Sequence, residues 1–126
     1  MKYLSFIVAM LFCLNAGAQT VSNSIVGKWM KMPKEDLIIE VYESGGGYSG
    51  KIEWSKDSTK QKGYVILKNL QFDDDNNSWE NGRIYDPRSG NEYKAAAKLK
   101  SDGTLEVLGY KGMKFIGTKK SFKRVI

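Results

Sequence analysis

The sequence predicts an all-β domain, and three observations lead to this prediction. From Gly27 onward, short runs rich in Val, Ile, Tyr, Phe, Trp and Thr alternate with clusters of Gly, Asp, Asn, Ser and Pro, as strands alternate with turns. The turn clusters recur roughly every 8–12 residues. No segment carries a long amphipathic helical period. Because short connections join antiparallel neighbours, we expect a meander that closes into a barrel or folds as a sandwich.

The N-terminal residues 1–18 have the parts of a secretory signal peptide. An apolar run follows Lys2, and Ala16-Gly17-Ala18 supplies small residues for cleavage. The run is shorter than the roughly 20 residues that a bilayer-spanning helix needs. A buried N-terminal helix is one alternative. A lipoprotein signal at Cys13 is another, which the bulky residue directly before this cysteine disfavours. We expect residues 19–126 to form one exported domain with no membrane span.

Eight segments are predicted to be strands: 26–32, 37–43, 48–55, 64–72, 79–85, 92–100, 104–109 and 115–124. The clearest alternation lies in 92–100, where Tyr93, Ala95, Ala97 and Leu99 point one way and Lys94, Lys98 and Lys100 the other. In 48–55 the same alternation predicts that Tyr48, Ile52 and Trp54 face inward. One face of each strand is therefore expected to be buried and the other wet.

The loop Asp86-Pro87-Arg88-Ser89-Gly90 is interpreted as a hairpin turn. Asp86 is suited to accept hydrogen bonds from the turn, Pro87 presets φ, and Gly90 allows the left-handed conformation. Every residue type has a turn role, so the charges of this loop need no catalytic explanation.

The composition excludes several kinds of chemistry. The chain has no histidine, and its one cysteine is Cys13 in the signal segment. The domain therefore lacks a disulfide, a histidine metal site and a histidine-based nucleophile pair. We expect no cofactor and no catalytic residue.

Two acidic features of the sequence bear on this expectation. Asp73, Asp75 and Asn77 have the spacing of oxygen ligands in a calcium loop. However, Ser78 and Ile84 stand where that loop carries Gly and Glu, and a plain turn prefers the same Asp and Asn residues. We expect no metal site.

Paired carboxylates are the second feature, because two of them can run glycoside hydrolysis. The available acids are Glu40, Glu43, Glu53 and Glu92. Glu40 and Glu53 fall on the predicted polar faces, where acids are simply solvated. An enzyme is therefore the third-ranked interpretation.

Two resemblances sharpen the fold. Gly27-Lys28-Trp29 in the first strand, with Arg124 in the last, is similar to the lipocalin arrangement, in which a Trp closes one barrel end and a late Arg packs across it. A closer resemblance is to the bacterial family of secreted proteins called domain of unknown function 2147. The segments that carry it are Tyr48–Ile52, Trp79–Ala95, Leu105–Gly112 and Phe115–Val125. Phe122 stands where that family usually has a Trp. The resemblance implies a single antiparallel, eight-stranded, up-and-down barrel, lipocalin-like, with Gly27, Trp29 and Arg124 at one end.

The interior is the predicted ligand-binding site. An eight-stranded barrel is either filled by its own side chains or holds one small ligand. The residues that we expect to line such a ligand are Ile39, Val41, Ile52, Trp54, Ile66, Tyr93, Ala95 and Ala97. Small residues leave space, but they also mark bulges in a tightly packed barrel. A hollow barrel and a solid barrel both remain open here.

The expected function is to bind a small apolar or amphipathic, lipid-like ligand in the cell envelope. The alternative is a solid barrel that meets an envelope protein or an anionic surface through basic residues such as Lys119, Lys120 and Lys123. The net charge of +6 would suit nucleic acid, but export excludes that partner.

Overall fold

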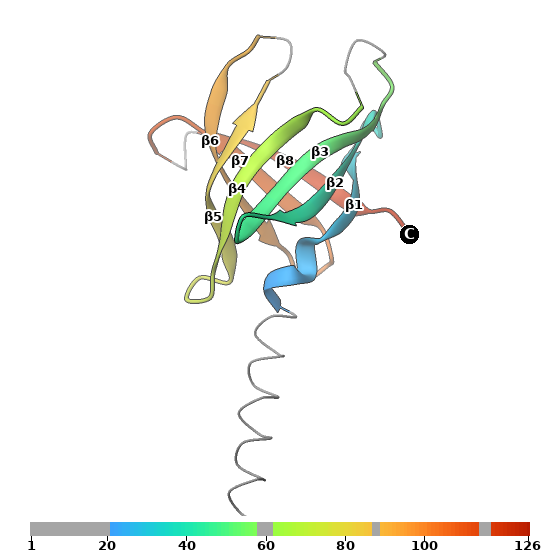
Figure 1. Ribbon diagram of the computed structural model, residues 1–126. Coiled ribbons are helices and arrows are strands. Elements are labelled where there is room, and N and C mark those ends of the chain that lie inside the picture. The colour runs from blue at the N-terminus through green and yellow to red at the C-terminus, as the bar shows by residue number, and fades with distance from the viewer. Residues whose placement is uncertain (1–20, 58–61, 87–88, 114–116) are drawn as a thin grey trace, which may run out of the picture.

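The computed structural model describes residues 21–57, 62–86, 89–113 and 117–126. The predicted signal peptide, Pro87 and the first part of the last predicted strand lie outside these residues. A short 3-10 helix precedes the strands (Figure 1). The elements are η1 (Asn23–Ile25), β1 (Gly27–Met32), β2 (Leu37–Ser44), β3 (Gly47–Ser55), β4 (Val65–Asp73), β5 (Ser78–Tyr85), β6 (Glu92–Leu99), β7 (Leu105–Tyr110) and β8 (Thr118–Arg124).

The eight strands form one closed barrel, in which each strand pairs with the next and β8 pairs with β1. Every pairing is antiparallel, and Trp29 lies opposite Arg124 where β1 meets β8. The predicted all-β, eight-stranded barrel is confirmed. Among the residues that the structure describes, no helix is long and apolar enough to cross a membrane.

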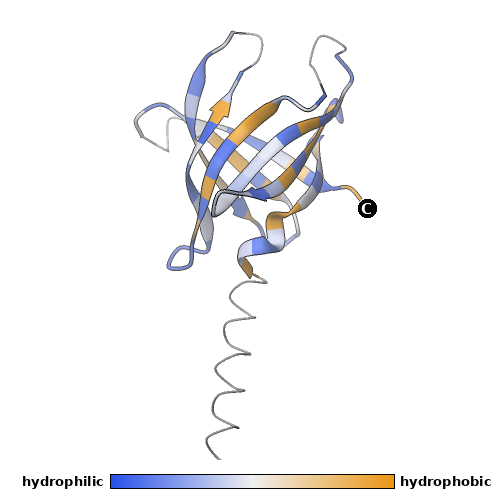
Figure 2. Cartoon of the chain, viewed as in Figure 1, coloured by the Kyte–Doolittle hydropathy of each residue, from blue (hydrophilic) through white to orange (hydrophobic). Residues whose placement is uncertain are grey.

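The barrel has two distinct ends, which follow from its up-and-down order. The β2–β3, β4–β5 and β6–β7 turns lie at the same end as η1, and β1, β3, β5 and β7 end at the other (Figure 1). We call these the η1 end and the mouth end. Hydrophobic and hydrophilic residues alternate along several strands (Figure 2), as expected when one face of a sheet is buried.

The predicted alternation in β6 is confirmed. Ala95 and Ala97 are buried, and the flanking Lys94 and Lys98 are exposed; Ala96, which lies between the two alanines, is buried as well. Ala95 lies opposite Gly82 of β5 and Gly109 of β7, so three small residues meet on the inner face at this level. The side chains at this level of the wall therefore take up little of the barrel interior.

The prediction that Trp54 faces inward is wrong. The register of β2 and β3 shifts between Ile38 and Ile39, so Ile52 pairs with Ile39 and Trp54 pairs with Ile38, leaving Glu53 as the extra residue. Such a bulge reverses the alternation beyond it. Trp54 is 45% exposed, whereas Ile52 is buried.

The β5–β6 hairpin has the predicted turn chemistry in its described part. Gly90 has a φ of +74°, in the left-handed region that glycine adopts without strain. Its N–H donates to the Asp86 carbonyl (2.8 Å), and the Asp86 N–H donates to the Asn91 carbonyl (2.9 Å). These bonds fix the register in which Tyr85 pairs with Glu92.

Candidate functional site

The η1 end of the barrel is closed by the Trp29–Arg124 pair. Trp29 is completely buried, and the Arg124 guanidinium carbon lies 4.3 Å from the centroid of its ring. The guanidinium also donates to the carbonyl oxygens of Ser24 and Val26. A Cβ on Gly27, whose φ is +135°, would come within 2.8 Å of Arg124 Nη1. Gly27, Trp29 and Arg124 thus lie together at this end of the barrel.

The residues around η1 complete this closure. Ile25 is completely buried, and its carbonyl accepts the Trp29 indole N–H at 2.9 Å. The Ser22 carbonyl accepts the Trp79 indole N–H at 3.0 Å, and Tyr48 donates its hydroxyl to the Asn23 side chain. Indole and phenol groups prefer a hydrogen-bond partner when buried, and this segment supplies one to each.

The half of the barrel next to η1 is solid. Ala97 lies opposite the buried Trp79. A Cβ on Gly82 would come within 2.6 Å of Leu70 Cδ2. The small residues of this half thus make room for large neighbours, as close packing requires.

Six of the eight predicted ligand-lining residues belong to the packed core, and four of them do not line the cavity: Ile39, Val41, Ala95 and Ala97. Trp54 lies on the outer surface. None of these five is among the described residues that line the cavity in the other half of the barrel.

The half of the barrel next to the mouth is hollow. It holds a cavity of about 590 Å³, which lies within the range of roughly 300–1,000 Å³ typical of small-molecule sites. The apolar side chains that line it are Leu37, Ile52, Ile66, Ile84, Val107 and Phe122. Ile84 and Tyr93 are opposite each other in the register of β5 and β6, and both are only half-buried.

Three of the eight predicted ligand-lining residues lie in this wall: Ile52, Ile66 and Tyr93. The sequence left open whether the barrel is hollow or solid. The half next to η1 is solid, and the half next to the mouth is hollow.

Polar groups also line the cavity, from the strand ends at the mouth. They are Lys31, Tyr85, Asp86, Tyr93, Tyr110, Lys111, Thr118 and Lys120. Sequence reasoning assigned Lys120 to an exterior basic surface and overlooked Lys31. The alternation along the strands could have shown that both lysines face inward. Residues two apart in a strand share a face, and Lys31 is two residues from Trp29, as Lys120 is from Phe122.

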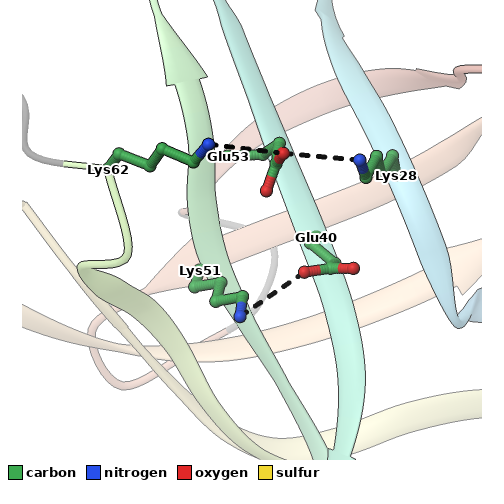
Figure 3. Close-up of polar contacts among 5 residues, drawn as sticks. All are labelled: Lys28, Glu40, Lys51, Glu53 and Lys62. Atoms are coloured by element: carbon green, nitrogen blue, oxygen red, sulfur yellow. Dashed lines mark hydrogen bonds and ion pairs between the residues drawn. The ribbon is translucent and has the colours of Figure 1, made fainter.

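The acids weighed for catalysis lie outside the barrel. Lys28 and Lys62 flank Glu53 at 3.3 and 3.9 Å, and Lys51 lies 3.5 Å from Glu40 (Figure 3). Glu92 pairs with Arg83 at 3.6 Å, and Glu43 is exposed. Of the described cavity-lining residues, only Asp86 carries a carboxylate, so the structure does not bring two of these acids together around the cavity.

The acidic tract after β4 forms the β4–β5 turn. The carboxylate oxygens of Asp73, Asp74 and Asp75 lie within 4.8 Å of one another. Asp73 Oδ1 accepts the backbone N–H groups of Asp75 and Asn76, and its Oδ2 accepts the Asn76 side-chain amide at 2.8 Å. These bonds account for the Asp73 carboxylate as part of the turn.

A comparison with protein families decides where the chain belongs. The family described as "Uncharacterized protein conserved in bacteria (DUF2147)" matches residues 27–124. The chain belongs to this family. The matched residues begin at Gly27 and end at Arg124, so family membership covers all eight strands of the barrel.

A solved structure is similar to this member of the family. It is the protein HP1028 from Helicobacter pylori, described as belonging to the lipocalin family. The TM-score is 0.67 at 19% sequence identity, over 81% of this chain and 83% of the other. At this identity the likeness shows a lipocalin-like fold. Comparison with the curated proteins gives no match.

Proposed function

We propose that this protein is exported and binds one small apolar or amphipathic, lipid-like ligand in the cavity at its mouth end, without catalysing a reaction. The cavity of about 590 Å³ is the observation that carries the proposal. The apolar residues that line the cavity point inward from strands whose other inward residues are closely packed. The cavity is therefore confined to one half of the barrel. A lipocalin-like barrel is compatible with a ligand at this place.

The alternative of a solid, basic interaction module has less support. Several exterior lysines pair with glutamates: Lys28 and Lys62 share Glu53, Lys100 and Lys119 share Glu106, and Lys51 pairs with Glu40. Such exposed pairs contribute little to stability, but they reduce the positive potential of the outer surface. The mouth half is also not solid.

The first experiment compares native and denatured masses of the protein purified gently from an exporting host. We expect a bound mass that disappears on denaturation, and a polypeptide that begins at Gln19. Equal masses, together with no binding of added single-chain lipids, would contradict the ligand proposal. A retained N-terminal segment would contradict export with cleavage.

The second experiment fills the cavity with Ile84→Trp. Ile84 lines the cavity and is half-buried, so the larger ring should occupy ligand space and reduce uptake at least about tenfold, a loss of about 1.4 kcal/mol. Ile38→Trp is the matched control, because Ile38 lies on the outer face opposite Trp54. Uptake is measured by calorimetry, with thermal unfolding to show that both variants fold. Equal uptake by both variants would place the ligand elsewhere.

A further inference from the structure

We propose that the cavity selects amphiphiles with an anionic headgroup, a carboxylate or a phosphate monoester, and holds this group with Lys31, Lys111 and Lys120. This inference rests on the proposed function and specifies its ligand class. The apolar wall would take the chain of the ligand, and the three ammonium groups would take its head.

The register of β7, β8 and β1 places two of these lysines on the inner face of the barrel. Lys120 lies opposite Val107, and Lys31 lies opposite Phe122. Val107 and Phe122 are buried core residues. Directly opposite residues in an antiparallel pair share a face of the sheet, so Lys120 and Lys31 share the face of the core.

Lys111 joins them from the end of β7. It lies two residues after Gly109, which lines the cavity, and its Nζ lies 5.0 Å from the centroid of the Tyr93 ring. Tyr93 is itself a cavity-lining residue. Three neighbouring strands thus direct cations toward one side of the mouth.

The charge of this wall is unbalanced. Three lysines face one carboxylate, that of Asp86, among the described lining residues. Within the described part of the chain, Lys111 and Lys120 form no ion pair, in contrast to Lys119 on the outer face, which pairs with Glu106. Lys111 and Lys120 are both exposed, so an anionic group of a ligand can reach their ammonium groups and pair with them.

The geometry also suits the two parts of an amphiphile. Lysine stems can lie along an apolar wall while their ammonium groups stay near water. The apolar lining residues Ile52 and Val107 lie inside β3 and β7, whereas Lys111 and Asp86 directly follow the mouth ends of β7 and β5. A cleft lined by one sign of charge concentrates the opposite charge at its entrance.

The test measures dissociation constants by calorimetry for three probes that share one chain: decanoate, decyl phosphate and decyltrimethylammonium. We expect both anionic probes to bind at least about tenfold more tightly than the cationic probe. The ratio between the two anionic probes distinguishes a carboxylate from a phosphate headgroup. Higher salt should weaken the binding of the anionic probes, which tests the wild-type protein without any substitution.

The matched variants are Lys120→Met and Lys119→Met, on the inner and outer faces of the same strand. Lys120→Met should weaken decanoate binding about fivefold or more and leave decyltrimethylammonium binding no weaker, because Met keeps the stem and removes the charge. Lys119→Met should change neither. Equal affinities for the three probes, or equal effects of the two variants, would overturn the inference while leaving the ligand site intact. If none of the probes binds, the proposed function fails as well.

Discussion

At the residue scale, Arg124 combines two kinds of contact, with a ring and with the backbone. Its guanidinium covers the Trp29 ring and also donates to two backbone carbonyls of the segment before β1. Hydrogen bonds from a charged donor contribute more than neutral ones, about 1.5–3 kcal/mol. One side chain from the last strand therefore holds the first strand and the segment leading into it.

We predict that Arg124→Met lowers the free energy of unfolding by about 2 kcal/mol, because Met can cover the ring but cannot donate to the carbonyls. Arg124→Lys should recover only part of this loss, since an ammonium lacks the planar fork of a guanidinium. Lys123→Met is the control, because Lys123 is exposed. Urea denaturation measures all three, and a loss no larger for Arg124→Met than for Lys123→Met would contradict this role.

At the scale of the elements, the bulge in β3 determines which side chains at the end of this strand are exposed to solvent. Glu53 is the extra residue, and it and Trp54 both reach the outer side, where Glu53 meets Lys28 and Lys62 (Figure 3). Without the bulge, Trp54 would follow Ile52 onto the inner face. The bulge therefore keeps a large ring out of the hollow half.

We predict that Trp54 is the tryptophan that a soluble quencher reaches. It is 45% exposed, whereas Trp29 and Trp79 are 0% and 1% exposed. Acrylamide should quench one part of the fluorescence strongly, and Trp54→Phe should abolish this part. Trp79→Phe is the control and should leave the strong quenching unchanged. Strong quenching that survives in Trp54→Phe would mean that Trp29 or Trp79, and not Trp54, is the accessible ring.

The elements also show what could be predicted from the sequence. Strand positions and the β6 alternation were predictable, because apolar periodicity and turn residues are local signals. The face of Trp54 was not, because a bulge depends on pairing between strands. The division into a solid and a hollow half was also not predictable. It depends on which small residues lie opposite large ones across neighbouring strands, such as Ala97 opposite Trp79. Lys120 was not predicted to line the cavity, because a run of basic residues along the chain does not show on which face of the strand each lysine lies.

At the scale of the whole molecule, the two halves have separate tasks. The η1 half carries the closing contacts around Trp29, whereas the mouth half holds the cavity, although the buried core extends into its wall. Stability and ligand affinity should therefore respond to different substitutions, because sites with no shared partners act nearly additively.

We predict that Ile25→Ala lowers the free energy of unfolding by about 2–4 kcal/mol and leaves ligand affinity unchanged. Ile25 is completely buried at the η1 end and is not among the described cavity-lining residues. Val26→Ala is the control, because Val26 is 39% exposed. Denaturation and calorimetry on the same samples test both statements. A weaker affinity in Ile25→Ala, measured well below its melting temperature, would show that the halves are coupled.

The place where the last strand ends has a practical consequence. After Arg124, the Val125 N–H donates to the Lys28 carbonyl at 2.9 Å, so the C-terminus leaves the barrel beside the start of β1 and away from the mouth. A biotin tag added after Ile126 would attach the protein to a sensor surface with its cavity facing the solution. Immobilised protein should then take up ligand as rapidly as free protein, whereas a tag inserted in the β5–β6 turn would crowd the entrance.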